Sequence, residues 1–211
     1  MKVGVNWYLT EPVAKVESSN KDGKHRVAVK YKVCDSALFE KLENVFNKNR
    51  SVASIEEQKP LRTRCFYHEK VDIFERERWH KKALKKLENC DVVFLDPDNG
   101  LEVDSAKGKK LSKYVLLDEL RPYINNGQSV VFYNHRSRKQ VGEYFIDLYK
   151  KLKKITIIKP FSISFHKGTI RDYIILAHTK HEVKLRDACT KMLESVWGPK
   201  IMKLCQVDYG N

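Results

Sequence analysis

The sequence predicts an α/β fold in which a mainly parallel sheet lies between layers of helices. Three observations indicate this class. Strand and helix patterns alternate along the chain, at least two of the strands are continuous apolar runs, and the helices carry apolar residues at helical spacing. A chain of 211 residues is long enough to bury the core of one such domain without disulfides or a structural metal.

The first third of the chain, residues 1–74, is expected to be irregular, with a hairpin across the turn at Asp22-Gly23. Asp35 has the side chain of a helix N-cap, and apolar residues follow it at helical spacing. The strands predicted in this part are Lys2–Leu9, Arg26–Val33, Ser51–Ile55 and Arg64–Tyr67.

Residues 75–211 form the regular part of what we predict to be a single domain, 1–211. A helix over Glu75–Asn89 is indicated because Trp79, Ala83 and Leu87 share one arc while lysines occupy the other. The further predicted strands are Asp91–Leu95, Ser129–Tyr133, Ile155–Ile158 and Asp172–Ala177, the last two forming an antiparallel C-terminal pair. The further predicted helices are 112–124, Gln140–Lys154 and His181–Trp197.

The composition and the net charge indicate which classes of partner the chain is expected to bind. Hydrophobic residues make up 42% of the chain, which is typical of a globular protein. The 41 Lys and Arg residues against 27 Asp and Glu give a formal net charge of +14, so a nucleic acid is the expected partner. No apolar run is long enough to span a membrane, and no membrane partner is expected. Nothing in the sequence indicates an oligomeric state.

The five cysteines indicate the compartment. They are scattered, odd in number and without a C-x-x-C pair. An oxidised framework and a zinc ribbon are both disfavoured by this pattern, and a cytoplasmic location is predicted.

Polar clusters follow the two buried strands, at the edge where open α/β sheets bind ligands. Asp96, Asp98 and Asn99 come directly after the first of these strands, and His135 follows the second. We expect these four side chains to be catalytic, with His135 as a general base. The candidate substrate-binding residues are Tyr133, Asn134, Arg136, Arg138, Lys109 and Lys110. The arginines and lysines among them carry positive charges that suit phosphate groups.

The stretch from about Asp91 to His178 resembles the second half of a class I S-adenosylmethionine-dependent methyltransferase. In that family a strand ends in an Asp/Asn-Pro-Pro-aromatic loop that receives the target amine, and the similar segment here is Leu95-Asp96-Pro97-Asp98-Asn99. The helix and strand that follow, and the last antiparallel pair, fit the family's order. The chain is also similar to a group of bacterial proteins without an assigned function that carry NWYLT, FLDPDNGLE and YNHR.

This resemblance implies a Rossmann-like three-layer sandwich and S-adenosylmethionine as the cofactor. Asn6 and Tyr8, at the end of the first strand, are the candidate cofactor-binding residues, and Glu56 or Glu57 is the candidate acid for the ribose, with Glu56 chosen for the site. The chain departs from the family in two ways. Asp98 and Asn99 replace the second proline and the aromatic, and no G-x-G follows the first strand.

Three functions remain open from the sequence. The first is a methyltransferase-like enzyme that acts on RNA or DNA. The second is a nuclease or phosphodiesterase in which Asp96, Asp98 and Glu102 hold Mg²⁺. The third is a basic nucleic-acid-binding module without catalytic activity.

Overall fold

The computed structural model describes residues 1–10, 29–48, 51–59, 63–137, 139–167, 169–198 and 202–205. The predicted turn at Asp22-Gly23 and the candidate Arg138 lie outside these residues. No helix in the described ranges is both long and apolar enough to cross a bilayer.

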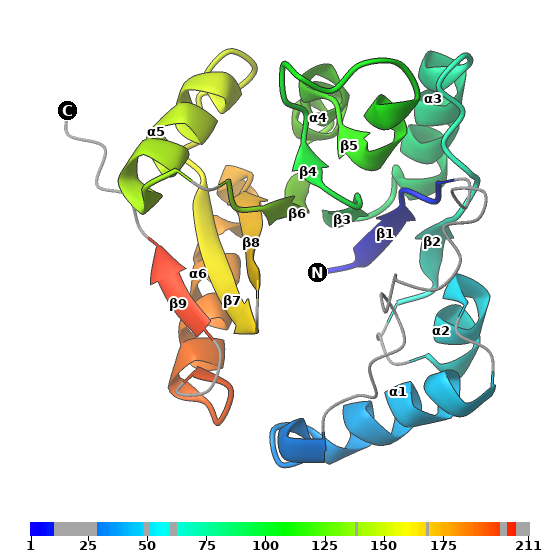
Figure 1. Ribbon diagram of the computed structural model, residues 1–211, viewed down its shortest axis with the longest axis vertical. Coiled ribbons are helices and arrows are strands. Elements are labelled where there is room, and N and C mark those ends of the chain that lie inside the picture. The colour runs from blue at the N-terminus through cyan, green and yellow to red at the C-terminus, as the bar shows by residue number, and fades with distance from the viewer. Residues whose placement is uncertain are drawn as a thin grey trace.

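A sheet of seven strands in the order β2-β1-β3-β6-β8-β7-β9 organises the molecule (Figure 1). Strands β2, β1, β3 and β6 run parallel, whereas β8 is antiparallel to both β6 and β7. The predicted fold class is therefore confirmed, and an antiparallel pair does lie near the C-terminus, although its first strand is β7 and not the predicted Ile155–Ile158. The strands are β1 (Val3–Trp7), β2 (Cys65–Tyr67), β3 (Val92–Asp96), β6 (Ser129–His135), β7 (Phe161–Lys167), β8 (Thr169–Leu176) and β9 (Met202–Cys205).

Three helices cover one face of the sheet: α3 (Arg76–Leu87), α4 (Leu117–Asn125) and α5 (Val141–Leu152). Their apolar sides pack on the side chains that the central strands direct toward them, such as Leu95 and Phe132, and form the main core. Figure 1 shows these helices along the upper side of the molecule, with α1 (Ser36–Lys48), α2 (Val52–Gln58) and α6 (Thr179–Glu194) below. Helix α6 closes a second, smaller core against β7 and β8.

Gly4 has a packing role in β1. A Cβ at this position would lie 2.8 Å from Cys90 Sγ and 2.9 Å from Leu87 Cδ2. The end of α3 therefore packs so closely on the strand that a Cβ at position 4 would require the Cys90 and Leu87 side chains to shift. The glycine in the first strand serves helix packing.

Two short elements near the N-terminus differ from expectation. Ser51–Ile55 is not a strand, because the Ser51 hydroxyl accepts a hydrogen bond from Ser54 N at 3.1 Å and caps α2. Within the predicted strand Arg26–Val33, of which residues 29–33 are described, Val29–Tyr31 is a 3-10 helix and a turn follows it. The prediction for Asp35 is confirmed, since its carboxylate accepts from Leu38 N at 2.9 Å at the start of α1.

The predicted boundaries also fail in the second half. Ser112 does not begin α4, because a 3-10 helix, η2 (Gly108–Lys113), and a short strand, β5 (Tyr114–Val115), precede it. Strand β5 pairs with β4 (Gly100–Leu101) in a separate two-stranded sheet. The apolar run Ile155–Ile158 is the connection between α5 and β7, not a strand.

Candidate functional site

The carboxyl ends of β1 and β3 form a topological switch point. From β1 the chain continues to β2 on one side, and from β2 it crosses through α3 to β3 on the other side. The segments that leave β1 and β3 therefore diverge, which is where open α/β sheets bind ligands. Trp7 and Asp96, the last residues of these strands, are partners in the parallel register.

Asp96 lies in an aromatic setting on the sheet face opposite α3, α4 and α5. Side chains alternate along a strand, so Asp96 shares its face with Trp7 on one side and with Tyr133 on the other. Tyr133 is paired with Tyr173 of β8, with 6.1 Å between the ring centroids. His135 follows on the same face, 5.3 Å from the Tyr133 ring. The structure thus brings Asp96 and His135 to one edge and one face.

The Asp96 carboxylate is largely buried, and the described residues offer it no compensating partner. Within the described part of the chain, no side-chain or backbone donor forms a hydrogen bond or ion pair with it. Burial is the main cause that raises the pKa of the Asp96 carboxyl to about 6, and the neighbouring charge of Asp98 acts in the same direction. A carboxyl group with a raised pKa at the ligand-binding edge is the strongest indication of a functional site in this molecule.

Replacing Asp96 with asparagine is expected to stabilise the protein at neutral pH. The pKa of Asp96 is about 6 in the folded state, against 3.8 for the ordinary group. The native state therefore binds more protons in this window, and the free energy of unfolding falls as pH rises from about 4 to about 6. Above pH 6 Asp96 is ionised in the folded protein, and the cost of burying its charge is present in full. The asparagine carries no charge, so the substitution is expected to raise the free energy of unfolding at neutral pH by up to about 2–3 kcal/mol.

Urea denaturation of the wild type and Asp96→Asn across this pH range measures the effect. Asp104→Asn is the matched control, because that carboxylate is fully exposed. Parallel pH profiles for the wild type and Asp96→Asn would contradict the assignment of a buried, uncompensated carboxylate.

The loop after Asp96 is fixed to β6 and to the end of η2 by backbone hydrogen bonds. Asn99 N donates to Lys113 O at 3.0 Å, and Asn99 O accepts from His135 N at 3.1 Å. The side chain of Asp98 is exposed and pairs with Lys113 at 3.5 Å. Asp98 therefore lies outside the buried part of the site, whereas Asn99 is half-buried beside His135.

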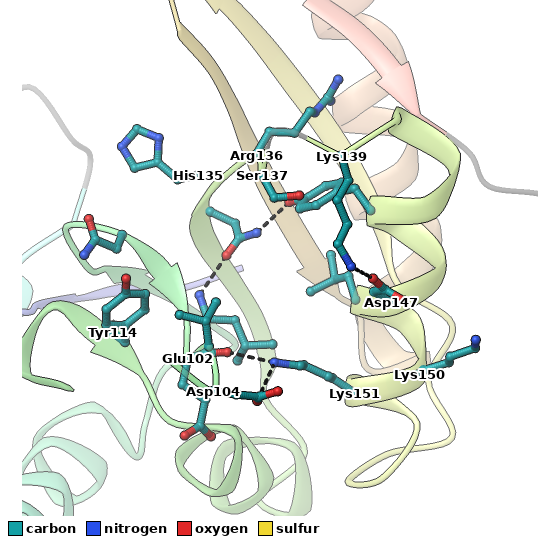
Figure 2. Close-up of a pocket in the computed structure, with 16 residues that line it drawn as sticks. Glu102, Asp104, Tyr114, His135, Arg136, Ser137, Lys139, Asp147, Lys150 and Lys151 are labelled. Atoms are coloured by element: carbon teal, nitrogen blue, oxygen red, sulfur yellow. Dashed lines mark hydrogen bonds and ion pairs between the residues drawn. The ribbon is translucent and has the colours of Figure 1, made fainter. Parts of the chain in front are cut away.

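A cleft of about 660 Å³ opens at the same edge, on the face that α5 covers. It lies between residues 99–104 and α5, and its basic side chains include Lys139, Lys150 and Lys151. Figure 2 shows Lys139 directed at Asp147 and Lys151 directed at Asp104, with the His135 ring on the far side of its strand from Arg136. Asn99 and His135 both line the cleft, and the His135 ring also lies beside Tyr133 on the sheet face of Asp96. The cleft and the Asp96 face therefore share these two residues.

Arg136 and Asn134 have structural roles that differ from the predicted phosphate and substrate contacts. The Arg136 guanidinium forms two hydrogen bonds with Asp172, at 2.9 Å and 2.6 Å, and both side chains are buried. The Asn134 amide oxygen accepts from Leu101 N at 2.7 Å, and its nitrogen donates to the Tyr144 hydroxyl. Because these groups are already paired inside the protein, we exclude both from the proposed site.

Asn6 and Tyr8 are likewise turned into the main core and not toward a ligand. Asn6 is 0% exposed and donates to the Tyr123 hydroxyl, and Tyr8 is 3% exposed and donates to Glu119. Of the three predicted cofactor-binding residues, Glu56 differs in that it contacts Trp7, the last residue of β1. Its carboxylate accepts from the Trp7 indole N–H at 3.1 Å and is bonded to His68 Nδ1 at 3.0 Å.

The three acids expected to hold Mg²⁺ are not gathered into a metal site. Asp96 is largely buried on one face, Asp98 pairs with Lys113, and the Glu102 carboxylate accepts from Leu117 N at 2.6 Å at the start of α4. Among the described residues, no group of three or more His, Cys, Asp or Glu side chains has the geometry to bind a metal ion.

The remaining predicted contacts lie around this edge. Lys109 and Lys110 are exposed on η2, which leads into β5. Tyr173 is a residue of the site that the sequence does not predict. Tyr173 lies on the same sheet face as Asp96 because the antiparallel register pairs it with Tyr133 of β6. The local sequence pattern does not specify that register.

No protein-family model and no curated protein matches the chain. Among solved structures, the chain is similar to a crystal structure of a protein from Legionella pneumophila str. Philadelphia 1, which is described with the family model DUF519. The sequence identity is 13%, the similarity covers 97% of this chain and 87% of that chain, and the TM-score is 0.43. A likeness of this degree says nothing about the function of the present chain.

Proposed function

We propose that the chain is a methyltransferase-like enzyme that acts on nucleic acid with S-adenosylmethionine as the methyl donor. The observation that carries this proposal is the place of Asp96. It ends β3 beside β1 at the switch point, it is largely buried without a partner among the described residues, and aromatic rings flank it.

Two further features support the proposal. The Asp96-Pro97-Asp98-Asn99 segment leaves the end of β3, which is a central strand next to β1, and the family resemblance compares this segment with the loop that receives the target amine. Strand β8 lies antiparallel between β6 and β7, in agreement with the order of the last strands in that family.

The residues at the switch point suit the cofactor in chemical type. S-adenosylmethionine, when bound, supplies an electrophilic methyl group on a cationic sulfonium. The Trp7 ring, oriented by Glu56, offers a flat surface for an adenine ring or a cation. Asp96 is in a position to hold the acceptor amine by hydrogen bonding and to take up the proton released on transfer, since its pKa lies near 6.

The lysines around the edge suit the nucleic-acid substrate. Lys109 and Lys110 lie on the exposed η2, and Lys139, Lys150 and Lys151 line the cleft beside His135. Contacts of these ammonium groups with phosphates would position the strand without reading its sequence. The excess positive charge of the chain would favour association with RNA or DNA at low salt.

Binding of S-adenosylmethionine and methyl transfer test the proposal directly. The cofactor at 100 times its Kd is expected to add about 2.7 kcal/mol to the free energy of unfolding, measured as a rise in Tm. Transfer of a tritiated methyl group to total RNA and to DNA is the second measurement. Asp96→Asn is expected to lower the transfer rate at least about 100-fold, because it removes the proton acceptor.

Asp118→Asn is the control for the loss of one carboxylate, since Asp118 is exposed at the start of α4. An unchanged Tm with the cofactor, together with no methyl transfer, would overturn the proposal. If oligonucleotides still bound under those conditions, the basic nucleic-acid-binding module would be supported instead.

A further inference from the structure

A second cavity, of about 770 Å³, lies at the opposite edge of the sheet from Asp96. It is bounded by the end of α4, by the connection between α5 and β7, and by the start of α6. Ala177, which lines it, directly follows the last residue of β8, and that residue pairs with Val130 near the start of β6. The cavity is therefore separated from the carboxyl edge by the length of the strands.

Five aliphatic residues contribute to the lining of this cavity, among polar and charged ones. Ile155 and Ala177 are buried, Ile124 and Ile158 are half-buried, and Ile157 is 100% exposed. Complete exposure of a β-branched aliphatic side chain forgoes all the stabilisation that its burial would give. A contiguous group of aliphatic side chains that is rimmed by polar residues and reaches the surface is typical of an interaction site, and Ile157 extends the buried and half-buried isoleucines of this cavity to the surface.

Basic side chains surround the aliphatic lining. Lys153, Lys154 and Lys159 are exposed along the connection, and Arg186 of α6 lies opposite them. Glu182 is the acid in the lining, and it already accepts from Arg186 Nε at 2.9 Å. Within the described ranges, the three ammonium groups have no carboxylate within 4.0 Å, so their charge is available to a partner.

We propose that this cavity binds an acidic segment of a partner protein through an aliphatic anchor residue. The anchor would fill the hollow over Ile155 and Ile158 and pack on Ile157, and flanking carboxylates would pair with the lysines. A nucleic acid fits the charge but not the lining. Nucleic-acid bases stack on aromatic rings and on arginine. The lining residues of these kinds are His178 and Arg186, and Arg186 already pairs with Glu182 and lies over the Phe161 ring, whereas the five aliphatic lining residues offer no stacking surface.

Fluorescence anisotropy with a synthetic peptide tests this assignment. The probe carries two adjacent leucines flanked on both sides by glutamates. In one matched peptide glycines replace the leucines, and in another lysines replace the glutamates. The leucine peptide is expected to bind most tightly, with affinity lowered at least about tenfold by Ile157→Asp and by the pair Lys153→Glu and Lys154→Glu.

The control variants carry the same changes elsewhere. Lys85→Glu with Lys86→Glu reverses two exposed lysines on α3, and Ile146→Asp alters a partly exposed isoleucine on α5. Both controls should retain peptide binding. The proposal is overturned if the probe does not bind at millimolar concentration, or if the glycine peptide binds equally well. It is also overturned if single-stranded oligouridylate displaces the probe and shows the same dependence on Ile157.

Discussion

Replacing Gly100 with alanine is expected to lower the free energy of unfolding by about 3–5 kcal/mol. Gly100 has φ +107°, a backbone conformation that residues with a Cβ rarely adopt. A Cβ here would lie 2.0 Å from Asn134 Oδ1 and 2.7 Å from Asn134 Cα. Because Asn134 Cα belongs to the backbone of the central strand β6, the strand cannot move aside without disturbing the sheet.

Urea denaturation measures this loss, and Gly142→Ala is the matched control. Gly142 lies in α5, and a methyl group added to its Cα would meet no atom within 4 Å outside the helix's own neighbouring backbone. Alanine there is expected to stabilise the protein by about 0.5–1 kcal/mol, as in other helices. Equal stability of Gly100→Ala and the wild type would show that the loop does not approach β6 so closely.

Arg136→Met is expected to cost about 3–5 kcal/mol, because it leaves a buried carboxylate without its partner. Asp172 is 0% exposed, and its two oxygens accept from the Arg136 guanidinium. The Ser164 hydroxyl donates to the same carboxylate at 2.6 Å, but one neutral donor does not replace the charge.

A double-mutant cycle separates the ion pair from the packing of the arginine. Adding Asp172→Asn to Arg136→Met is expected to recover part of the loss, since no buried charge then remains. Lys139→Met is the control, because it breaks an exposed pair with Asp147 and should cost less than about 1 kcal/mol. A loss of that small size for Arg136→Met would assign Arg136 to the solvent and return it to the candidate substrate contacts.

The regular half of the fold was predictable because its signals are local. The arc of Trp79, Ala83 and Leu87 defines α3, and the continuous apolar run after Asp91 defines β3. The N-terminal third was less predictable, since Ser51 and Val52 suit both a strand and a capped helix. The run Ile155–Ile158 has the composition of a strand, but most of its side chains line a surface cavity and do not enter the centre of the sheet.

The site was predictable to the extent that strand ends define an edge of the sheet. Asp96 and His135 lie at that edge as expected. The roles of Arg136 and Asn134 were not predictable, because their partners come from distant parts of the chain. Asp172 is 36 residues beyond Arg136 in the sequence. Asp172 lies beside Arg136 only because of the register in which β8 pairs with β6.

The position of β8 has a consequence for synthesis on the ribosome. Strand β8 is made after β7 but lies between β7 and β6. Until residues 169–176 have emerged, β7 has no bonded neighbour toward the centre, and the hydrogen-bonding edge of β6 stays open. The nascent chain thus carries an unsatisfied strand edge from the completion of β6 until β8 emerges, a state in which chains are prone to pair with one another.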